Sequence, residues 1–543
     1  MNASITCNVL QSALNCGVTE FVVCPAGRNA SFIEVLRCKQ RIKTYYWPEE
    51  RSAAFFALGL SRRKRRPVAV IVTSGTAAGE LLPAAMEAYY SGVPLLLITA
   101  DRPLRFRGSG APQTAEQVNL FGPYVQFCVD IDDHQGCDLS KWTQQLPAHI
   151  NVCLEEPQGE LAYSGKPLEM NTVQLQTHKR QFDQNQIANI IDHFLSQIER
   201  PLVIVSTLPN HAKAQVTELL LKLNAPVYLE GVSGLRENPS LQVLRIKNTE
   251  SMLEFAESSD YAIDGVLRIG GIPTNRIWRD IENLNNKIKV CSLSELSFSG
   301  LSWNSNVGCA DIEKFLQKYQ PIRSFDLKNA EEWLKNDDKF FKKLQDLYKE
   351  EPLAEPSLIH ALANAMPKNS HVYLGNSLPI REWDLSAGIQ ERGLQVTASR
   401  GLNGIDGQIA TFLGLCQSDR DNWAILGDLT TLYDMAGFWA LPFVEAPNVS
   451  VAVINNGGGK IFERMFFHPE MLNSHGLSFE PLAKMWGLSY ECWGNGLKAL
   501  ENAKRQLIEI IPDDASTKRF WDKMGCMKQA HLACARSQIE SVF

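Results

Sequence analysis

Two polar side chains, 28 positions apart, could together hold a divalent metal ion. Asp428 follows the apolar run 424–426, and Asn456 follows a second apolar run at 449–454 and precedes three glycines. If both runs are parallel strands joined by a helix, they end at the same edge of a sheet and the two side chains meet there. Carboxylate and amide oxygens are hard ligands that suit Mg²⁺ bridged to phosphate oxygens, and glycine backbone N–H groups can approach an anion closely. The sequence therefore predicts a site for a metal-bridged diphosphate.

A second candidate for chemistry is the carboxylate of Glu50, at the start of a predicted helix. Acidic residues are favoured in a first helical turn by the helix dipole, so ordinary N-terminal charge is one interpretation. The helix that follows, residues 51–59, contains mainly apolar and small residues, which favours a buried position for its start. A carboxylate held in a buried cleft can act as a tuned acid or base.

Four arginines follow predicted strand ends or glycine-containing turns. Arginine in such a place can hold a carboxylate through two hydrogen bonds, although a single arginine is more often part of a structural ion pair. Four arginines in equivalent places indicate an acidic small-molecule substrate with several carboxylates. They are Arg28, Arg102, Arg381 and Arg400.

Short apolar strands that alternate with helical patterns must position these side chains. This alternation predicts parallel α/β sheets, in which ligands bind outside the carboxyl ends of the strands. The first set of strands is expected at 21–23, 67–72, 94–99 and 149–152, the second begins at 201–205, and the third begins near residue 357. We expect a polar linker from about 165 to 186, a charged connecting helix at 326–350, and α/β domains at 1–175, 186–325 and 350–543.

Length and composition restrict the class of protein. A chain of 543 residues is too long for one core, and its 45 % hydrophobic and 21 % charged residues are typical of a globular protein. A net charge of −6 gives no electrostatic argument for nucleic acid or for an anionic membrane. No apolar run is long enough for a transmembrane helix, and the N-terminus lacks the features of a signal peptide. The 13 cysteines show no metal-binding spacing, so reduced thiols and a cytoplasmic location are expected.

Six sequence motifs together resemble a known enzyme family. The motifs are GDLTTLYD (427–434), NNGGGKIF (455–462), VAVIVTSGTA (68–77), ITADRP (98–103), GNSLPIR (375–381) and SRGLNGIDG (399–407). They resemble the 2-succinyl-5-enolpyruvyl-6-hydroxy-3-cyclohexene-1-carboxylate synthases, the thiamine-diphosphate-dependent enzymes of menaquinone biosynthesis. The resemblance extends from about residue 6 to about residue 515 and is weakest in the middle domain.

The resemblance implies an α/β fold with three parallel-sheet domains of the thiamine-diphosphate enzyme type: a pyrimidine-binding, a central and a diphosphate-binding domain. The cofactor would lie between the first domain of one subunit and the third of another, in a homodimer or homotetramer. Asp428, Asn456 and the Gly458 carbonyl would bind Mg²⁺, with Mn²⁺ as a possible substitute. Glu50 would be the catalytic residue, hydrogen-bonded to the aminopyrimidine ring. The other cofactor contacts would be Asn376, Ser377, Ile405, Leu429, Thr430 and Ile461.

The family's reaction is the decarboxylation of 2-oxoglutarate and the addition of the resulting carbanion to isochorismate. Two acidic substrates would account for the arginines. The substrate contacts implied by the resemblance are Arg28, Arg102, Gln113, Arg276, Arg381, Arg400 and Phe462.

Several positions depart from the family pattern. Gly27 stands where a serine is usual, Pro112 replaces an asparagine, Arg276 replaces a lysine, and Cys153 replaces a proline. The cofactor residues match while the isochorismate side differs, so another thiamine-diphosphate-dependent 2-oxo acid decarboxylase or carboligase with a different acceptor is an alternative. A catalytically silent relative that binds the cofactor or serves as a scaffold is a second alternative, against which the intact Glu50 argues.

Overall fold

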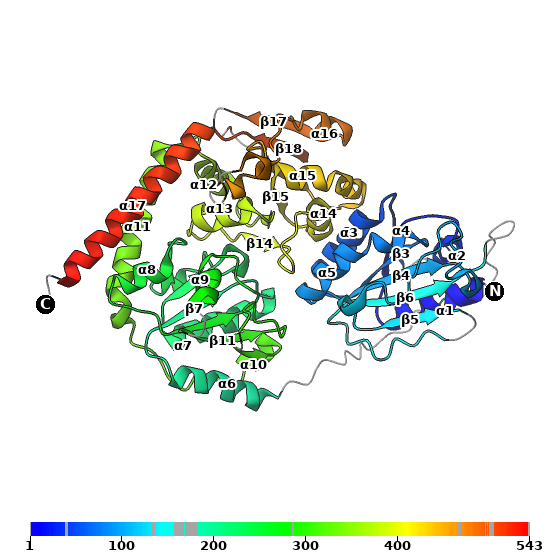
Figure 1. Ribbon diagram of the computed structural model, residues 1–543, viewed down its shortest axis with the longest axis horizontal. Coiled ribbons are helices and arrows are strands. Elements are labelled where there is room, and N and C mark those ends of the chain that lie inside the picture. The colour runs from blue at the N-terminus through cyan, green and yellow to red at the C-terminus, as the bar shows by residue number, and fades with distance from the viewer. Residues whose placement is uncertain are drawn as a thin grey trace. The chain divides into compact units, whose positions relative to one another are not determined.

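Three six-stranded sheets, in which every strand pair is parallel, form the framework of the protein (Figure 1). This arrangement confirms the predicted α/β class with three parallel sheets. The computed structural model describes residues 2–37, 42–132, 136–156, 168, 183–284, 287–303, 305–463, 466, 468–494, 496, 498 and 504–540. Most of the predicted linker lies outside these residues, and the four domain boundaries remain predictions.

The first sheet has the strand order β2-β1-β3-β4-β6-β5, and its inner strands are buried on both faces. Double burial explains why these strands are continuous apolar runs in the sequence. The strands are β1 (Glu20–Val23), β2 (Lys43–Tyr46), β3 (Val68–Val72), β4 (Leu95–Asp101), β5 (Cys128–Ile131) and β6 (Ala148–Cys153). The helices are α1 (Asn2–Asn15), α2 (Ala30–Arg37), α3 (Glu50–Lys64), α4 (Thr76–Gly79) and α5 (Leu82–Ser91).

The second sheet has the order β12-β11-β10-β7-β8-β9 and contains the strands predicted from 201 onwards. They are β7 (Pro201–Val205), β8 (Val227–Leu229), β9 (Arg245–Ile246), β10 (Gly265–Ile269), β11 (Lys289–Ser294) and β12 (Asn306–Cys309). The helices are α6 (Gln184–Ser196), α7 (Lys213–Leu223), α8 (Met252–Glu257), α9 (Ile277–Leu284) and α10 (Ile312–Leu316).

The third sheet has the order β14-β13-β15-β16-β18-β17, which repeats the strand order of the first sheet. Its strands are β13 (His371–Leu374), β14 (Gln395–Ala398), β15 (Asp421–Gly427), β16 (Asn448–Ile454), β17 (Ser489–Trp493) and β18 (Arg505–Ile510). The helices are α12 (Glu355–Ala365), α13 (Leu378–Ser386), α14 (Gln408–Leu415), α15 (Asp428–Tyr433) and α16 (Glu480–Met485).

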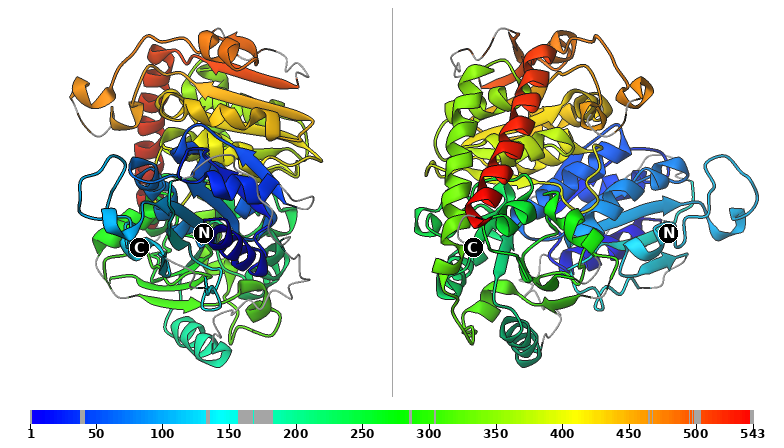
Figure 2. Two further views of the ribbon diagram at one scale, coloured as in Figure 1. Left: turned by 90° about the vertical axis from the view of Figure 1, so that its right-hand side faces the viewer. Right: turned by 60° about the vertical axis from the view of Figure 1, so that its left-hand side comes forward.

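Two long helices lie side by side in Figures 1 and 2. Helix α11 (Glu331–Glu350) confirms most of the predicted connecting helix, and α17 (Asp514–Glu540) follows the last strand of the third sheet. Phe340 of α11 and Phe520 of α17 belong to one buried cluster, so apolar packing joins the two helices. An ion pair between Lys523 and Glu350 lies at their surface.

The chain divides into two compact units that do not follow the sheets. The first unit comprises Met1–Gln181, Ser399–Asp419 and Thr430–Ala446, so it combines the first sheet with α14 and the 3₁₀ segment η7 (Met435–Phe443). The second unit contains the other two sheets. Within the first unit, α14 packs against α3 through glycines on both helices. A Cβ at Gly59 would lie 2.3 Å from the Thr411 carbonyl oxygen, and one at Gly414 would lie 2.5 Å from that of Phe56.

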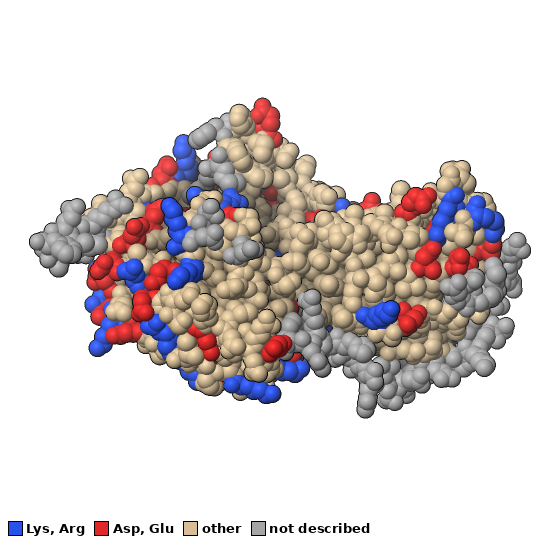
Figure 3. All heavy atoms as spheres, turned by 60° about the horizontal axis from the view of Figure 1, so that its bottom comes forward, with Lys and Arg blue, Asp and Glu red and all other residues tan. Residues whose placement is uncertain are grey.

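The protein surface carries both signs of charge. Lysine and arginine side chains are interspersed with aspartate and glutamate on the face shown in Figure 3. No described helix is long and apolar enough to cross a membrane. The cysteines that the structure describes are free thiols, as their sequence spacing predicts.

Asp337 on α11 gives the second unit a pH-dependent stability. Its carboxylate is buried and accepts hydrogen bonds from the backbone N–H groups of Lys247 and Asn248, at 2.8 and 2.9 Å. Burial raises the pKa of Asp337 to about 6. The folded protein therefore keeps a proton that the unfolded chain loses near pH 4, and this contribution to stability declines as pH rises from about 4 to about 6.

We expect Asp337→Asn to remove this decline, which amounts to about 3 kcal/mol over two pH units. Thermal unfolding of the variant and of the wild type at pH 4.5 and 7 measures the difference. Asp338→Asn, at the more exposed neighbouring position, should keep the wild-type pH dependence. Equal pH dependence of Asp337→Asn and wild type would contradict the assignment.

Candidate active site

Asp428 and the glycine loop after β16 meet at one edge of the third sheet. Strands β15 and β16 are neighbours in parallel register, with Gly427 opposite Ile454. Asp428 is therefore at the end of one strand, and Asn456 is two residues beyond the end of the other. The backbone N–H of Gly458 donates to Asp428 Oδ2 at 2.8 Å. The strand–helix–strand pattern in the sequence predicted this shared edge.

A second segment of the chain holds the glycine loop in place. Gly459 N–H donates to the carbonyl oxygen of Leu472 at 2.5 Å, and His475 N–H donates to that of Gly457 at 3.0 Å. Gly458 has φ +144°, and a Cβ there would lie 2.4 Å from the Leu472 carbonyl oxygen. Only glycine fits this position, and its backbone is bared toward the Asp428 carboxylate.

Three buried carboxylates gather at this edge. Asp428 is 2 % exposed, and Glu355 and Glu382 are each 3 % exposed. Burial raises the pKa of Glu355 and that of Asp428 above the usual carboxylate range, and Asp428 and Glu355 disfavour each other's charge. His475 Nε2 lies 3.3 Å from Asp428 Oδ2, and Lys460 supplies a further positive charge. The surplus of buried oxygen ligands favours binding of an additional cation.

The oxygen of the Asn456 side chain supports the same conclusion. Asn456 Nδ2 donates to both carboxylate oxygens of Glu355, at 3.1 and 3.0 Å. Its Oδ1 is buried and has no hydrogen-bond partner among the residues described. A buried amide oxygen without a donor is costly unless a cation occupies the space beside it. The carboxylate, the amide oxygen and a backbone carbonyl therefore fit the ligand preference of Mg²⁺.

The turn after β13 lies next to this edge, because β13 pairs with β15. Asn376 is buried, and Ser377 has φ +74° and ψ −125°, a conformation that costs energy for any residue except glycine. Arg381, in the first turn of α13, donates from Nη1 to the Ser377 carbonyl oxygen at 2.5 Å. The structure thus places Asn376 and Ser377 on the turn and Arg381 in the helix that follows it, at the same end of the sheet as Asp428.

The other predicted residues near this edge come from two short helical segments. Leu429 N–H donates to Asp428 Oδ1 at 2.6 Å, and Thr430 follows it, buried, in the first turn of α15. Ile461 and Phe462 belong to the 3₁₀ turn η8 (Lys460–Phe462), directly after the glycine loop. Both side chains are partly exposed.

Glu49 and Glu50 have different roles at the start of α3. Glu49 is the N-cap, and its carboxylate oxygens accept from the backbone N–H groups of Arg51 and Ser52, both at 2.9 Å. Glu50 is half-buried in the first turn. Burial, helped by the nearby carboxylates Glu49 and Glu80, raises the pKa of Glu50. Helix-dipole charge therefore explains Glu49, whereas Glu50 is a carboxyl group that can hold a proton more readily than an exposed one.

Arg28, Arg102 and Gln113 lie together at the carboxyl edge of the first sheet. Arg28 donates to the Leu154 carbonyl oxygen at 3.0 Å, and Arg102 Nε donates to that of Pro112 at 2.7 Å. Burial and the positive charge of Arg102 lower the pKa of Arg28. Gln113 adopts φ +57° beside Gly75. Two adjacent cations of this kind suit a ligand with carboxylate groups.

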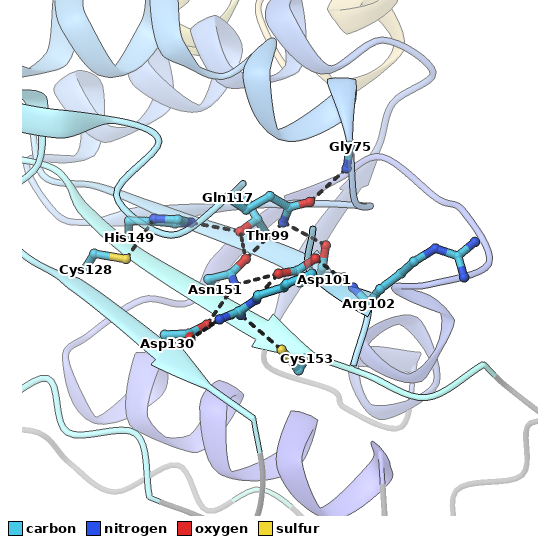
Figure 4. Close-up of polar contacts among 12 residues, drawn as sticks. Gly75, Thr99, Asp101, Arg102, Gln117, Cys128, Asp130, His149, Asn151 and Cys153 are labelled. Atoms are coloured by element: carbon cyan, nitrogen blue, oxygen red, sulfur yellow. Dashed lines mark hydrogen bonds and ion pairs between the residues drawn. The ribbon is translucent and has the colours of Figure 1, made fainter. Parts of the chain in front are cut away.

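Gln117 ties three strand ends together beside these residues (Figure 4). Its side-chain oxygen accepts from Gly75 N–H at 2.8 Å, and its amide nitrogen donates to the Ala100 carbonyl oxygen and to Asn151 Oδ1. Asn151 in turn donates to Asp101 Oδ2 at 3.0 Å. These contacts join the ends of β3, β4 and β6 and fix the backbone that carries Arg102.

Known proteins are similar to this chain in sequence. Residues 8–120 match the family model described as the N-terminal TPP binding domain of thiamine pyrophosphate enzymes, TPP being another name for thiamine diphosphate. A 2-succinyl-5-enolpyruvyl-6-hydroxy-3-cyclohexene-1-carboxylate synthase of Bdellovibrio bacteriovorus is 40 % identical over 531 residues, which are 96 % of this chain and 98 % of the relative. The chain belongs to this synthase family. Synthases of the same name from Akkermansia muciniphila and Bacillus velezensis are 34 % and 30 % identical, over 95 % and 88 % of the chain and 98 % and 88 % of their own lengths.

Family membership makes the chain a thiamine-diphosphate-dependent, C–C bond-forming enzyme and confirms the resemblance found in its motifs. The structure shows what surrounds two of the positions that depart from the family pattern. A Cβ at Gly27 would meet no atom within 4 Å, so the space of the usual serine is open. Cys153 Sγ accepts from Arg107, which also pairs with Asp101 and Asp130. Cys153 thus belongs to the network that supports the synthase's first sheet edge.

The remaining predicted residues of the synthase lie on loops. Arg400 is the second residue after β14, and Ile405 lies between β14 and α14. Arg276 precedes α9, is 80 % exposed at its side chain and pairs with Asp280 of that helix. The structure gives Arg276 no partner in the predicted site, and its role remains a prediction.

Sequence reasoning missed Glu355, Glu382 and His475. An acidic residue before a proline at a helix start is typical of an ordinary N-terminal turn, so the sequence gives no reason to single out Glu355. Glu382 is inside α13 and matches no motif. His475 lies in an irregular segment, where spacing alone gives no indication of what it contacts.

Proposed function

We propose that the protein decarboxylates 2-oxoglutarate and adds the resulting four-carbon unit to isochorismate, forming 2-succinyl-5-enolpyruvyl-6-hydroxy-3-cyclohexene-1-carboxylate in menaquinone biosynthesis. The observation that carries this proposal is the 40 % identity to a synthase of that product over 96 % of the chain. Similarity over that share of the chain supports the same activity rather than only the same cofactor.

Mg²⁺ would be held by Asp428, Asn456 and the Gly458 carbonyl, with Mn²⁺ able to replace it. The buried, unpartnered Asn456 oxygen and the carboxylates beside it support this assignment. The turn at Asn376 and Ser377 would bind the diphosphate together with the backbone of Leu429 and the hydroxyl of Thr430. Ile405 and Ile461 would pack against the cofactor.

Glu50 would hold a proton at the aminopyrimidine ring. Its raised pKa supports this role, because the carboxyl group must be protonated for part of the cycle. Bound thiamine diphosphate supplies the nucleophile for decarboxylation and C–C bond formation, and the protein supplies binding, orientation and proton control.

The arginines would bind the carboxylates of both substrates. The adjacent Arg28 and Arg102, with Gln113 beside them, present positive charge at the first sheet edge. Arg381, Arg400 and Phe462 would complete the substrate pocket, and Arg276 would contact substrate from the central domain.

A homodimer or homotetramer would be the active form. The residues proposed for the pyrimidine end are on the first sheet, whereas those for the metal and diphosphate are on the third. The family resemblance implies that the cofactor lies between those domains of different subunits, so a complete site would require two subunits. A cytoplasmic location and the absence of nucleic-acid and membrane partners remain predictions.

Incubation with thiamine diphosphate, Mg²⁺, 2-oxoglutarate and isochorismate should release CO₂ at a rate that depends on isochorismate. Chelation of the metal with EDTA should abolish the release, and added Mg²⁺ should restore it. Mass spectrometry of the product checks that the four-carbon unit is attached to the isochorismate ring. Absence of isochorismate-dependent CO₂ release would overturn the proposal.

A related function with another acceptor is a second candidate. The open space at Gly27 and the Pro112 substitution lie beside the proposed isochorismate contacts and favour it. Turnover of 2-oxoglutarate with other acceptors but not with isochorismate would support this candidate. Lack of any turnover by a protein that binds thiamine diphosphate would instead indicate a silent relative.

A further inference from the structure

We propose that Glu355 is a positioning residue that orients the Asn456 side-chain amide so that its oxygen faces the metal ion. The inference rests on the proposed Mg²⁺ site and adds a residue that is not itself a ligand. Glu355 is one of the residues that the sequence motifs did not single out, and it is separated from Asn456 by 101 positions.

The chemistry of the contact determines which way the amide points. An asparagine side chain has one end that donates and one end that accepts hydrogen bonds, whereas an ionised carboxylate only accepts. Asn456 Nδ2 donates to the two oxygens of Glu355 at 3.1 and 3.0 Å, so the donating end faces Glu355. The accepting end, Oδ1, is then directed away from Glu355, and it is the atom that lacks a partner.

Helix α12 holds the backbone of Glu355 in place. Glu355 is the first residue of the helix, and Pro356 follows it, which rigidifies the turn. Its backbone N–H donates to Thr517 Oγ1 of α17 at 3.0 Å. An acid at a helix start is commonly exposed, but Glu355 is 3 % exposed and its partner is the Asn456 amide. Dipole stabilisation alone therefore does not account for its burial.

Glu355 would act on the metal site through Asn456. Both of its oxygens accept from the Asn456 amide nitrogen, at 3.1 and 3.0 Å. Residues that orient a metal ligand in this way commonly change metal affinity by about 10–100-fold when replaced.

Glu355→Gln tests the inference directly. The new amide would present either a donor to the donating end of Asn456 or a single acceptor, so the Asn456 amide would lose its fixed orientation. We expect the dissociation constant for Mg²⁺, measured by isothermal titration calorimetry at saturating thiamine diphosphate, to rise about 10–100-fold. Thermal unfolding without metal should remain close to that of the wild type.

Glu382→Gln is the matched control, because it removes an equally buried carboxylate that hydrogen-bonds Glu355, whereas the amide of Asn456 donates to Glu355 itself. Its Mg²⁺ affinity should change by much less. Equal loss in both variants would show a general charge effect and overturn the orienting role, as would wild-type affinity in Glu355→Gln. If Glu355→Gln does not fold, Glu355→Asp provides the same comparison, because it keeps the charge and withdraws the oxygens from Asn456.

The wild-type protein separates failure of this inference from failure of the proposed function. If Mg²⁺ does not bind to the wild type in the presence of thiamine diphosphate, the metal site itself is wrong and the role of Glu355 falls with it. If the wild type binds Mg²⁺ and Glu355→Gln binds it equally well, only the role of Glu355 is wrong.

Discussion

Replacing Glu50 by glutamine is expected to lower kcat by about 10²- to 10⁴-fold, the usual contribution of a positioned acid or base. Glutamine retains the size of the side chain and can still accept a hydrogen bond, but it cannot hold or release a proton. Burial of Glu50, together with the nearby carboxylates Glu49 and Glu80, raises its pKa. The wild-type carboxyl group therefore binds and releases a proton at a higher pH than an exposed glutamate. Steady-state CO₂ release measures the effect.

Glu49→Ala provides the contrast for this prediction. Glu49 accepts from two backbone N–H groups at the start of α3, so its loss should lower stability by about 1 kcal/mol. Turnover per folded molecule should change little. The two substitutions are thus expected to have different effects: Glu50→Gln lowers the turnover rate, and Glu49→Ala lowers stability. Full turnover by Glu50→Gln would show that Glu50 is not the activating acid.

Gly414→Val should reduce the free energy of unfolding by about 3 kcal/mol or more, at the upper end of the usual cost of overpacking. Any Cβ at Gly414 would lie 2.5 Å from the Phe56 carbonyl oxygen and 2.8 Å from the Leu60 backbone nitrogen. Because these are backbone atoms of α3, no side-chain rotation relieves the contact, and the two helices must separate. Thermal unfolding and the soluble yield of the variant measure the effect.

Gly525→Ala on α17 is the matched glycine control. A Cβ at this position would meet no atom within 4 Å. Because alanine favours a helix over glycine, stability should stay the same or rise by up to about 1 kcal/mol. A Gly414→Val protein that unfolds at the wild-type temperature would show that α3 and α14 do not need this close approach.

Local sequence patterns predicted the sheets and one edge of the site, for a physical reason. A parallel strand buried on both faces must be a short apolar run, and the residue after it must lie at the sheet edge. Asp428 and Asn456 could be placed by this rule without further information. The strand order that the first and third sheets share could not be predicted in this way, because strand order depends on contacts between distant segments.

The contacts missed by sequence reasoning depend on tertiary structure. Glu355 becomes distinctive only when its carboxylate meets the amide of Asn456 from a different part of the chain. Gly59 and Gly414 are ordinary helix residues until the two helices cross. Arg276 illustrates the opposite case: the family resemblance implies a substrate contact there, the structure shows an exposed side chain paired with Asp280, and its role stays a prediction.

The crossing of α3 and α14 also has a consequence for biosynthesis of the chain on the ribosome. Gly59 and Gly414 are 355 positions apart, so α3 is made roughly 20–70 s before α14 at about 5–20 residues per second. Every residue of α3 from Ser52 to Ser61 is buried in the finished protein. Throughout that interval the apolar surface of α3 that α14 will cover is exposed. We therefore expect the partly synthesised chain to bind chaperones, and a chain truncated before α14 to aggregate.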